Sequence, residues 1–264
     1  MHASKLLFTL LLSLISYNAA LAASCESHSA TTRAALIELY TSEGCSSCPP
    51  ADKWLRALVP NTLLASEVVP LAFHVDYWDR LGWRDRFASP AYTARQQDYS
   101  KVSGSSYIFT PQIIVAGRNY QNWSNNSQVQ KHIRSDLLVT PDAVINLHQQ
   151  PIASGKLEYA IQAQIQKGVS PDNVRIFTAL FQNGLVSEVA RGENSGSQLH
   201  HDYVVRELHI SNAGDQTGTI NVKNRFTMPD DTVVKAMGIA VFAQDIKTGV
   251  VLQAMSAPLC LSGK

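Results

Sequence analysis

The sequence predicts an α/β domain that carries a helical, aromatic-rich insertion and is followed by an antiparallel β-sandwich domain. Three observations predict this order. Residues 34–75 read as an apolar strand, an amphipathic helix and a second apolar strand, which together form a βαβ unit. Residues 143–264 show short runs of alternating apolar and polar residues, separated by turn sequences. Pro141 lies where one pattern gives way to the other, so we expect domains over 34–141 and 142–264.

Composition narrows the classes of protein to which the chain can belong. Of its 264 residues, 45% are hydrophobic and 16% are charged, which is enough apolar surface for a packed core and excludes a disordered chain. The formal net charge is +1 and no basic block occurs, so nucleic acid is not an expected partner. Beyond the N-terminus, no segment has the length and apolarity of a membrane span.

Residues 1–23 are expected to form a cleaved secretory signal peptide. An apolar run over 6–15 is followed by small residues that match the small-x-small cleavage pattern. The run is too short for a membrane anchor. A lipoprotein signal would attach its lipid to Cys25, but Ala22 stands three residues earlier, where leucine is usual, so lipidation is the less favoured alternative. Export predicts a periplasmic or secreted protein in an oxidising compartment.

The elements of the first domain follow from apolar spacing and from the positions of proline and glycine. The two strands of a parallel βαβ unit end at the same edge of the sheet, which brings the segments after them together. The expected order is strand 34–41, helix 51–58, strand 68–75, helix 91–102, strand 112–115, a short strand near Tyr120 and helix 128–138. In the second domain, strands are expected at 157–165, 174–181, 219–226, 237–242 and 250–255.

Cys45 and Cys48 form a Cys-x-x-Cys motif at the turn from the first strand into the first helix. Thiol–disulfide oxidoreductases carry their redox pair at such a turn. We expect Cys45 to be the exposed nucleophile and Cys48 the more buried resolving thiol. Backbone N–H groups and the helix dipole lower a thiol pKa there. Pro49 and Pro50 fit only a first helical turn, so the helix either begins near Ser47 or is distorted.

Glu38 is a carboxylate within the apolar strand ahead of the motif, on the same strand face as Tyr40. A carboxylate in such a strand must be paired, solvated or protonated. One interpretation is that Glu38 accepts the proton of the resolving thiol during exchange. The alternatives are an exposed edge residue and a structural partner of a basic side chain.

The segment after the second strand is dense in aromatic and charged residues, including His74, Asp76 and Trp78. It is interpreted as a wall of a substrate groove or as a packed insertion that covers the sheet end. A third interpretation is a Cu(I) site formed by His74 with Cys45 and Cys48. A structural zinc site would need four ligands, and no cofactor is expected.

Three further features complete the candidate sites. The Thr110-Pro111 bond precedes a strand and is a candidate cis peptide bond. His200 and His201 are adjacent on an expected strand, so they point to opposite faces and do not share a metal. Residues 192–196 (Gly-Glu-Asn-Ser-Gly) are expected to form a turn.

These residues carry a resemblance to the thioredoxin fold. The order of strand, Cys-x-x-Cys, helix, strand, insertion and Thr-Pro before a hairpin is similar to that fold. The resemblance implies that Thr110 and Pro111 pack against the redox cysteines and help to bind the substrate polypeptide. Gly44 replaces the aromatic residue that thioredoxin has before its first cysteine. More closely, the chain resembles a family of secreted bacterial thioredoxin-like proteins of unassigned function, at residues 38–52, 74–79, 110–112 and 192–196.

Cys25 and Cys260 lie near the two ends of the mature chain. The termini of a domain often lie close together at its surface, so this pair is predicted to form a structural disulfide. The alternative is two unrelated free thiols, which would be unusual in a secreted protein.

The sequence therefore predicts a periplasmic or secreted thiol–disulfide oxidoreductase that uses Cys45 and Cys48. Its expected partners are thiol- or disulfide-containing protein substrates, or a redox partner protein. The alternatives are a copper(I)-binding protein and a non-catalytic thioredoxin-like binding scaffold. The redox potential of the cysteine pair decides between a disulfide donor and a reductase.

Overall fold

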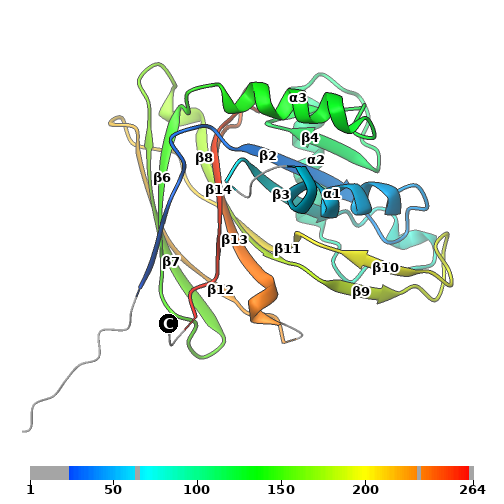
Figure 1. The fold of residues 1–264 in the computed structure, drawn as a ribbon. Coiled ribbons are helices and arrows are strands. Elements are labelled where there is room, and N and C mark those ends of the chain that lie inside the picture. Colours follow the sequence, from blue (N-terminus) through cyan, green and yellow to red (C-terminus); the bar gives the residue numbers. More distant parts are fainter. Residues whose placement is uncertain (1–23, 63–65, 231–232, 262–264) are drawn as a thin grey trace, which may run out of the picture.

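The protein is a sheet-rich α/β structure in which helices cover one part of a long mixed sheet (Figure 1). The computed structural model describes residues 24–62, 66–230 and 233–261, so the expected signal peptide at 1–23 lies outside the described residues. The helices are α1 (Pro49–Thr62), α2 (Pro90–Val102) and α3 (Asn126–Leu137), with short 3₁₀ turns at Asp79–Leu81, Pro171–Asn173 and Val234–Ala236. The strands are β1 (Cys25–His28), β2 (Ala35–Thr41), β3 (Val68–His74), β4 (Gln112–Val115), β5 (Arg118–Asn119), β6 (Ala143–Gln149), β7 (Lys156–Ile165), β8 (Val174–Gln182), β9 (Leu185–Glu188), β10 (Gln198–His201), β11 (Val204–Ile210), β12 (Thr219–Thr227), β13 (Met237–Asp245) and β14 (Val251–Pro258).

The largest sheet has eight strands in the order β14-β13-β8-β11-β3-β2-β4-β5. Strand β2 runs parallel to β3 over seven residue pairs, as expected for a βαβ unit, and antiparallel to β4. Strand β11 joins β3 in parallel through Val204 and Ala72, and the Ala72 amide donates a 2.8 Å hydrogen bond to the carbonyl of Tyr203. The strands of the two halves of the chain therefore form one continuous sheet.

Both faces of β2 are buried, because helices cover them from opposite sides. Ile37 and Leu39 pack with residues of α1 and α3, including Leu55 and Ile133. The alternate residues of β2 pack toward Tyr92 and Tyr99 of α2. Alternation along a strand explains this division, since successive side chains point to opposite faces. Every residue of β2 is buried in consequence.

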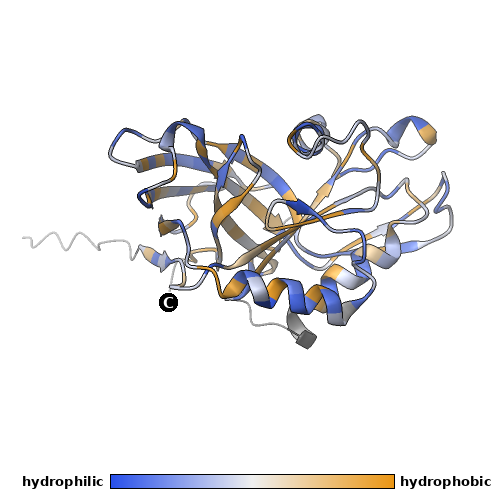
Figure 2. Cartoon of the chain, turned by 90° about the horizontal axis from the view of Figure 1, so that it is seen from above, coloured by the Kyte–Doolittle hydropathy of each residue, from blue (hydrophilic) through white to orange (hydrophobic). Residues whose placement is uncertain are grey.

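A second sheet has four antiparallel strands in the order β1-β6-β7-β12. Its apolar face packs against β8, β13 and β14 of the large sheet through a cluster that includes Leu147, Ile161, Phe226 and Val241. The cartoon coloured by hydropathy shows hydrophobic and hydrophilic residues interspersed along the strands (Figure 2). The alternating burial of β7 follows from this single buried face.

The large sheet contains strands from both sides of Pro141, where a domain boundary was predicted. Strands were predicted on both sides of Pro141, and they are present, but the boundary there does not separate two independent sheets. Strands β8, β11, β13 and β14 extend the sheet begun by β2 and β3. In addition, β1 precedes the predicted boundary and pairs with β6 after it. The small hairpin of β9 and β10 returns toward α1, as Figure 1 shows.

Candidate functional site

The candidate site begins where β2 ends and the chain turns into α1. The Cys45 amide donates to the Ser42 carbonyl at 3.2 Å, and the Cys48 amide donates to the Cys45 carbonyl at 3.2 Å. Helix α1 begins at Pro49, so Pro49 and Pro50 occupy the first turn, where a missing N–H costs no helical hydrogen bond. Neither Pro49 nor Pro50 therefore interrupts the helix. Cys45 precedes the helix by a whole turn, which weakens any effect of the helix dipole on its thiol.

Cys45 and Cys48 are joined by a disulfide bond. Both residues are completely buried, while Ser46 and Ser47 between them are exposed. The Ser47 hydroxyl lies 3.4 Å from Cys45 Sγ. The expectation of an exposed Cys45 is therefore wrong for this structure, because a loop from the second half of the chain covers the turn.

That loop is residues 189–197, which connect β9 to β10, and we call it the covering loop. Asn194 Nδ2 donates to the carbonyls of Glu43 and Cys45, at 2.9 and 3.0 Å. Glu193 accepts a 3.1 Å hydrogen bond from the Ser46 amide, and hydrogen bonding by Ser46 lowers the pKa of Glu193. Gly192 has a φ of +78°, and a side chain there would begin 3.2 Å from Trp83 Cβ. The loop thus holds the backbone on both sides of Cys45.

Thr110 and Pro111 directly precede β4, and the bond between them is cis. Trp78 links this segment to the turn. Its indole Nε1 donates to Thr110 Oγ1 at 2.8 Å, and its Cβ lies 3.1 Å from the point where a side chain on Gly44 would begin. Glycine at position 44 therefore allows the close approach of Trp78. Trp78 thus connects Thr110, the residue before the cis proline, to Gly44, the residue before Cys45.

Glu38 occupies a closed network that does not involve the cysteines. Its carboxylate accepts hydrogen bonds from Arg95 Nε at 2.6 Å and Nη2 at 3.0 Å, and from the hydroxyls of Tyr99 at 2.5 Å and Tyr40 at 3.2 Å. Burial and the charge of Glu38 raise the pKa of both tyrosines well above the usual range. Glu38 shares the sheet face of α2, whereas α1 packs on the opposite face. The interpretation of Glu38 as proton acceptor for Cys48 is therefore replaced by that of a structural partner for Arg95.

His74 and Asp85 form a buried pair at the end of β3. Nδ1 of His74 lies 2.6 Å from Asp85 Oδ2, and both side chains are fully buried. Burial alone would lower the pKa of His74, but the charge and hydrogen bond of Asp85, together with the charges of Asp52 and Glu43, outweigh it and the pKa is raised. Burial opposes ionisation of Asp85 as well, and His74 nevertheless lowers its pKa. Asp85 also accepts a 2.9 Å hydrogen bond from the Glu43 amide, so the pair supports the cysteine turn from beneath. His74 is consequently not the wall of an open groove.

A second buried pair, Glu43 and His201, lies against the first. Glu43 Oε1 is 3.4 Å from His201 Nε2, and Glu43 Oε2 accepts a 2.7 Å hydrogen bond from Trp83 Nε1. Burial opposes ionisation of Glu43, yet the neighbouring His201, Ser187 and Trp83 together hold its pKa below the usual value. The rings of His74 and His201 meet edge to face with their centroids 5.0 Å apart. His200 is exposed and His201 is buried, as the strand alternation predicted.

Several polar atoms of this cluster lack a hydrogen-bond partner among the described residues. They are His74 Nε2, Glu43 Oε1, Ser187 Oγ and both ring nitrogens of His201. Buried polar groups without partners are rare in proteins and point to a chemical role or to bound water. Across the described ranges, no group of three or more His, Cys, Asp or Glu side chains is arranged to hold a metal ion.

Asp52 is the carboxylate nearest in the chain to the resolving cysteine, one helical turn after Cys48. Its amide donates to the Cys48 carbonyl at 3.1 Å, and Thr41 Oγ1 donates to its Oδ2 at 3.2 Å. Asp52 therefore lies in the first turn of α1, and Cys48 immediately precedes that helix. Burial raises the pKa of Asp52, while the nearby His201 and His74 partly offset this.

Sequence reasoning missed several residues of this site. Asp52 follows the motif by one turn, and that spacing was a usable signal. Asn194, Glu193 and His201 lie about 150 residues from the cysteines, and only the resemblance at residues 192–196 pointed to that loop. Asp76, predicted as a site residue, instead accepts a 2.6 Å hydrogen bond from Thr93 Oγ1 at the start of α2.

The remaining cysteines form the second disulfide. Cys25 and Cys260 are joined, with their Cα atoms 5.7 Å apart, and the bond ties β1 to the end of the chain that follows β14. No cysteine in the described part of the chain is free. A search of the same residues for membrane spans finds no helix with the length and apolarity to cross a bilayer.

Comparison with known proteins gives a family and two solved structures of similar fold. A crystal structure of a protein from Agrobacterium tumefaciens, determined by a structural genomics consortium, is similar with a TM-score of 0.61 and 26% sequence identity, over 87% of this chain and 95% of that one. HBP35 of Porphyromonas gingivalis is similar with a TM-score of 0.64 over 87% of this chain and 76% of that one. At 12% identity the second likeness concerns the fold alone. No curated protein matches the chain in sequence.

The family model spans residues 36–244, which include both cysteines of the motif, the proline segment and the covering loop. It matches most of the chain. The chain therefore belongs to the family described as "Protein of unknown function (DUF1223)".

Proposed function

We propose that the protein is an exported, thioredoxin-like thiol–disulfide oxidoreductase. The observation that carries the proposal is a Cys-x-x-Cys disulfide in the turn after β2, together with a cis Thr110–Pro111 bond that Trp78 connects to Gly44, the residue before Cys45. The strand order β3-β2-β4-β5, with β2 parallel to β3, supports a thioredoxin-like unit. The packing of the four-stranded sheet against β8, β13 and β14 supports a β-sandwich, and the separate β9–β10 hairpin supplies the covering loop.

The reaction requires no cofactor beyond the two cysteines. A substrate thiolate attacks one sulfur of the disulfide, which breaks the Cys45–Cys48 bond and leaves a mixed disulfide on Cys45 with Cys48 as the leaving thiolate. A second substrate thiolate then attacks the substrate sulfur of the mixed disulfide. The substrate becomes a disulfide, and the two electrons it loses reduce Cys45 and Cys48 to thiols. The reverse sequence reduces a substrate disulfide.

Asp52 is the group that we assign to proton transfer at Cys48. The leaving thiolate must take up a proton, and the half-buried Asp52 carboxyl, whose pKa is raised, is protonated more often than a carboxyl with an ordinary pKa. His74 and His201, whose unpaired ring nitrogens lie in the same buried cluster, are suited to pass protons onward through water. In the reverse reaction Asp52 accepts the proton of the Cys48 thiol.

An oxidising compartment agrees with this assignment. Disulfides persist in the periplasm and outside the cell, and the chain holds two of them. We therefore place the protein in the periplasm or outside the cell, with thiol-containing proteins or a redox protein as its partners.

Single-cysteine variants test the proposal. In Cys48→Ser the remaining Cys45 should form a stable mixed disulfide with glutathione, visible as added mass, and insulin reduction by dithiothreitol should no longer be accelerated. In Cys45→Ser the activity should also be lost. Ser46→Ala, an exposed neighbour, serves as the matched control and should retain activity. Equal activity in Cys45→Ser and in the wild type would refute the assignment.

One observation favours a second candidate, a non-catalytic thioredoxin-like scaffold. The disulfide is completely buried, whereas a catalytic disulfide must meet its substrate. The two candidates differ in whether the covering loop opens. A scaffold keeps its disulfide intact under thiol buffers that reduce a catalytic pair.

A further inference from the structure

The protein has an apolar groove on the face of the large sheet that carries α2. It is lined by α2 and by residues of β8, β11 and β13, and its volume is about 680 Å³. Its walls include Phe177, Leu208 and Ile210, and three of its apolar side chains are unusually exposed: Ile210 at 60%, Ile246 at 43% and Val102 at 39%. Exposed apolar side chains that gather in a concave site of this size are typical of ligand binding.

The groove contains a buried guanidinium, that of Arg95, which is only 8% exposed. Its Nε and Nη2 bond Glu38, and Nη2 also bonds Tyr99 and Gln244. Nη1 has no hydrogen-bond partner among the residues that the structure describes, which leaves two donors for a ligand. The Arg95 Cζ lies 4.4 Å from the centroid of the Phe177 ring. The groove thus combines an apolar wall with an unused polar donor.

The two ends of the groove differ in charge. Arg175 lies at the end of the groove near Gln244 and Gly249, because it pairs with Gln244 across β8 and β13. Lys101 lines the groove as well. Arg175 donates to the carbonyls of Asp172 and Val174 and has no carboxylate partner within the described ranges. Lys101 is paired with Asp98, so the surplus at this end is one positive charge.

The opposite end of the groove is apolar. Ile210 pairs with Phe177, and Leu208 pairs with Ala179 two residues further along β8, away from Arg175. Ala91 and Ala94 of α2 line the groove as well. The groove therefore runs from a cationic end to an apolar one.

We propose that this groove binds a free single-chain amphiphile with an anionic head group, such as a fatty acid. The chain lies along Phe177, Leu208 and Ile210, and the carboxylate lies toward Arg175 and Arg95. Apolar burial supplies the affinity and the cationic end sets the orientation. The inference is independent of the redox proposal, since no residue of the cysteine turn lines the groove.

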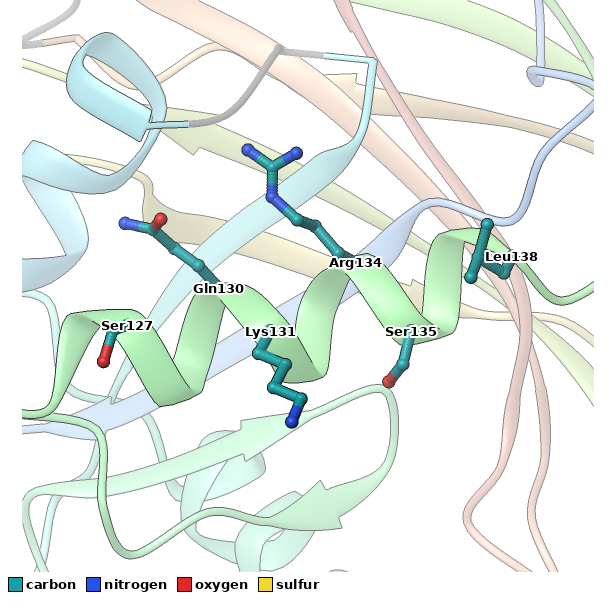
Figure 3. A pocket seen from close by; sticks show the side chains of 6 residues that line it. All are labelled: Ser127, Gln130, Lys131, Arg134, Ser135 and Leu138. Carbon is teal, nitrogen blue, oxygen red and sulfur yellow. The ribbon is translucent and has the colours of Figure 1, made fainter.

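A second hollow, along the outer face of α3, lacks these features (Figure 3). Its lining residues all belong to the α3 segment, and Figure 3 shows their side chains projecting to two sides of the helix instead of converging. Lys131 and Arg134 there are exposed to solvent. That hollow is a solvated helix face and supports no ligand.

Displacement of the fluorescent fatty acid 11-(dansylamino)undecanoate tests the groove in the full chain. Laurate should displace the probe. Ile210→Glu should weaken probe binding at least tenfold, because it places a negative charge against the ligand chain. Val144→Glu, at a valine of β6 that is 41% exposed, is the matched control and should bind as the wild type does. Circular dichroism establishes that both variants fold.

The charge of the head group is tested separately. Arg175→Gln should weaken laurate binding severalfold and leave binding of dodecanol unchanged. Absence of laurate binding, equal loss in Val144→Glu, or binding only to anionic phospholipid vesicles would each overturn the proposal. Equal affinity for laurate and dodecanol in the wild type would overturn its anionic part.

Discussion

Asn194→Ala should open the covering loop and expose the disulfide. Asn194 Nδ2 donates two hydrogen bonds, to the carbonyls of Glu43 and Cys45. A buried hydrogen bond contributes about 1 kcal/mol net, so the variant should destabilise the closed loop by about 2 kcal/mol. Since 1.4 kcal/mol is a tenfold change in an equilibrium constant, the open population should rise about 30-fold.

The rate of reduction of Cys45–Cys48 measures that population. If a thiol reaches the disulfide only when the loop is open, reduction by dithiothreitol should accelerate by the same factor of about 30. The reaction is quenched with a maleimide at intervals. Peptide mass spectrometry then separates the labelling of Cys45 and Cys48 from that of Cys25 and Cys260.

Gln253→Ala is the matched control for this experiment. Gln253 is fully buried, and its Nε2 also donates to two carbonyls, those of Ala30 at 2.9 Å and Thr32 at 3.1 Å. Its loss should lower the free energy of unfolding without accelerating reduction. The reasoning is refuted if Asn194→Ala leaves the rate unchanged, or if Gln253→Ala accelerates reduction equally, since global unfolding would then control access.

Three further predictions concern stability. Asp52→Asn should slow thiol exchange yet raise the melting temperature at pH 7. Burial raises the pKa of Asp52, so ionisation of this carboxyl lowers the stability of the folded protein at pH values above 3.8, its pKa in the unfolded chain. Calorimetry should therefore show that the gain in melting temperature vanishes in acid. Asp85→Asn should cost about 3 kcal/mol near pH 6 in urea unfolding. The cost should shrink as the pH rises through the raised pKa of His74, because the contribution of protonated His74 to stability is complete only below pH 6.5. It should also shrink as the pH falls through the lowered pKa of Asp85. A cost that is constant from pH 3 to 10 would contradict the ion pair. Replacing Cys25 and Cys260 by serine should cost on the order of 5 kcal/mol of unfolding free energy, because the bond closes a loop with a sequence separation of 235, and an unchanged denaturation midpoint would refute this.

Local patterns predicted the βαβ unit and its neighbours well. The apolar run at β2, the amphipathic spacing of α1 and the β-branched run at β3 each specify their element with little help from the rest of the chain. The short strands β9 and β10 lack such a signal. They form because they pair with one another and return toward α1, which is a tertiary effect.

The union of the two halves into one sheet was not predictable from the sequence. It depends on a single parallel pairing, between Val204 of β11 and Ala72 of β3, across 132 positions of the chain. Register of this kind is set by packing, because hydrogen bonds at a strand edge are the same for any partner.

The candidate site shows the same division. The positions of Cys45, Cys48 and Pro111 were predicted from the Cys-x-x-Cys motif and from the Thr-Pro pair before a strand. The chemistry of thiol–disulfide exchange needs these residue types after the first strand and before the third. The role of Glu38 did not follow, because strand alternation fixes which residues share a face but not which helix covers that face. Arg95, its actual partner, lies 57 residues away and is brought to it by α2.

An equilibrium redox titration of Cys45–Cys48 in glutathione buffers tests the central claim most directly. A catalytic pair should titrate reversibly as a two-electron couple between about −120 and −270 mV, the range of known thiol–disulfide oxidoreductases. A potential below about −300 mV, where structural disulfides lie, would contradict the proposed activity and leave the buried disulfide as part of a scaffold.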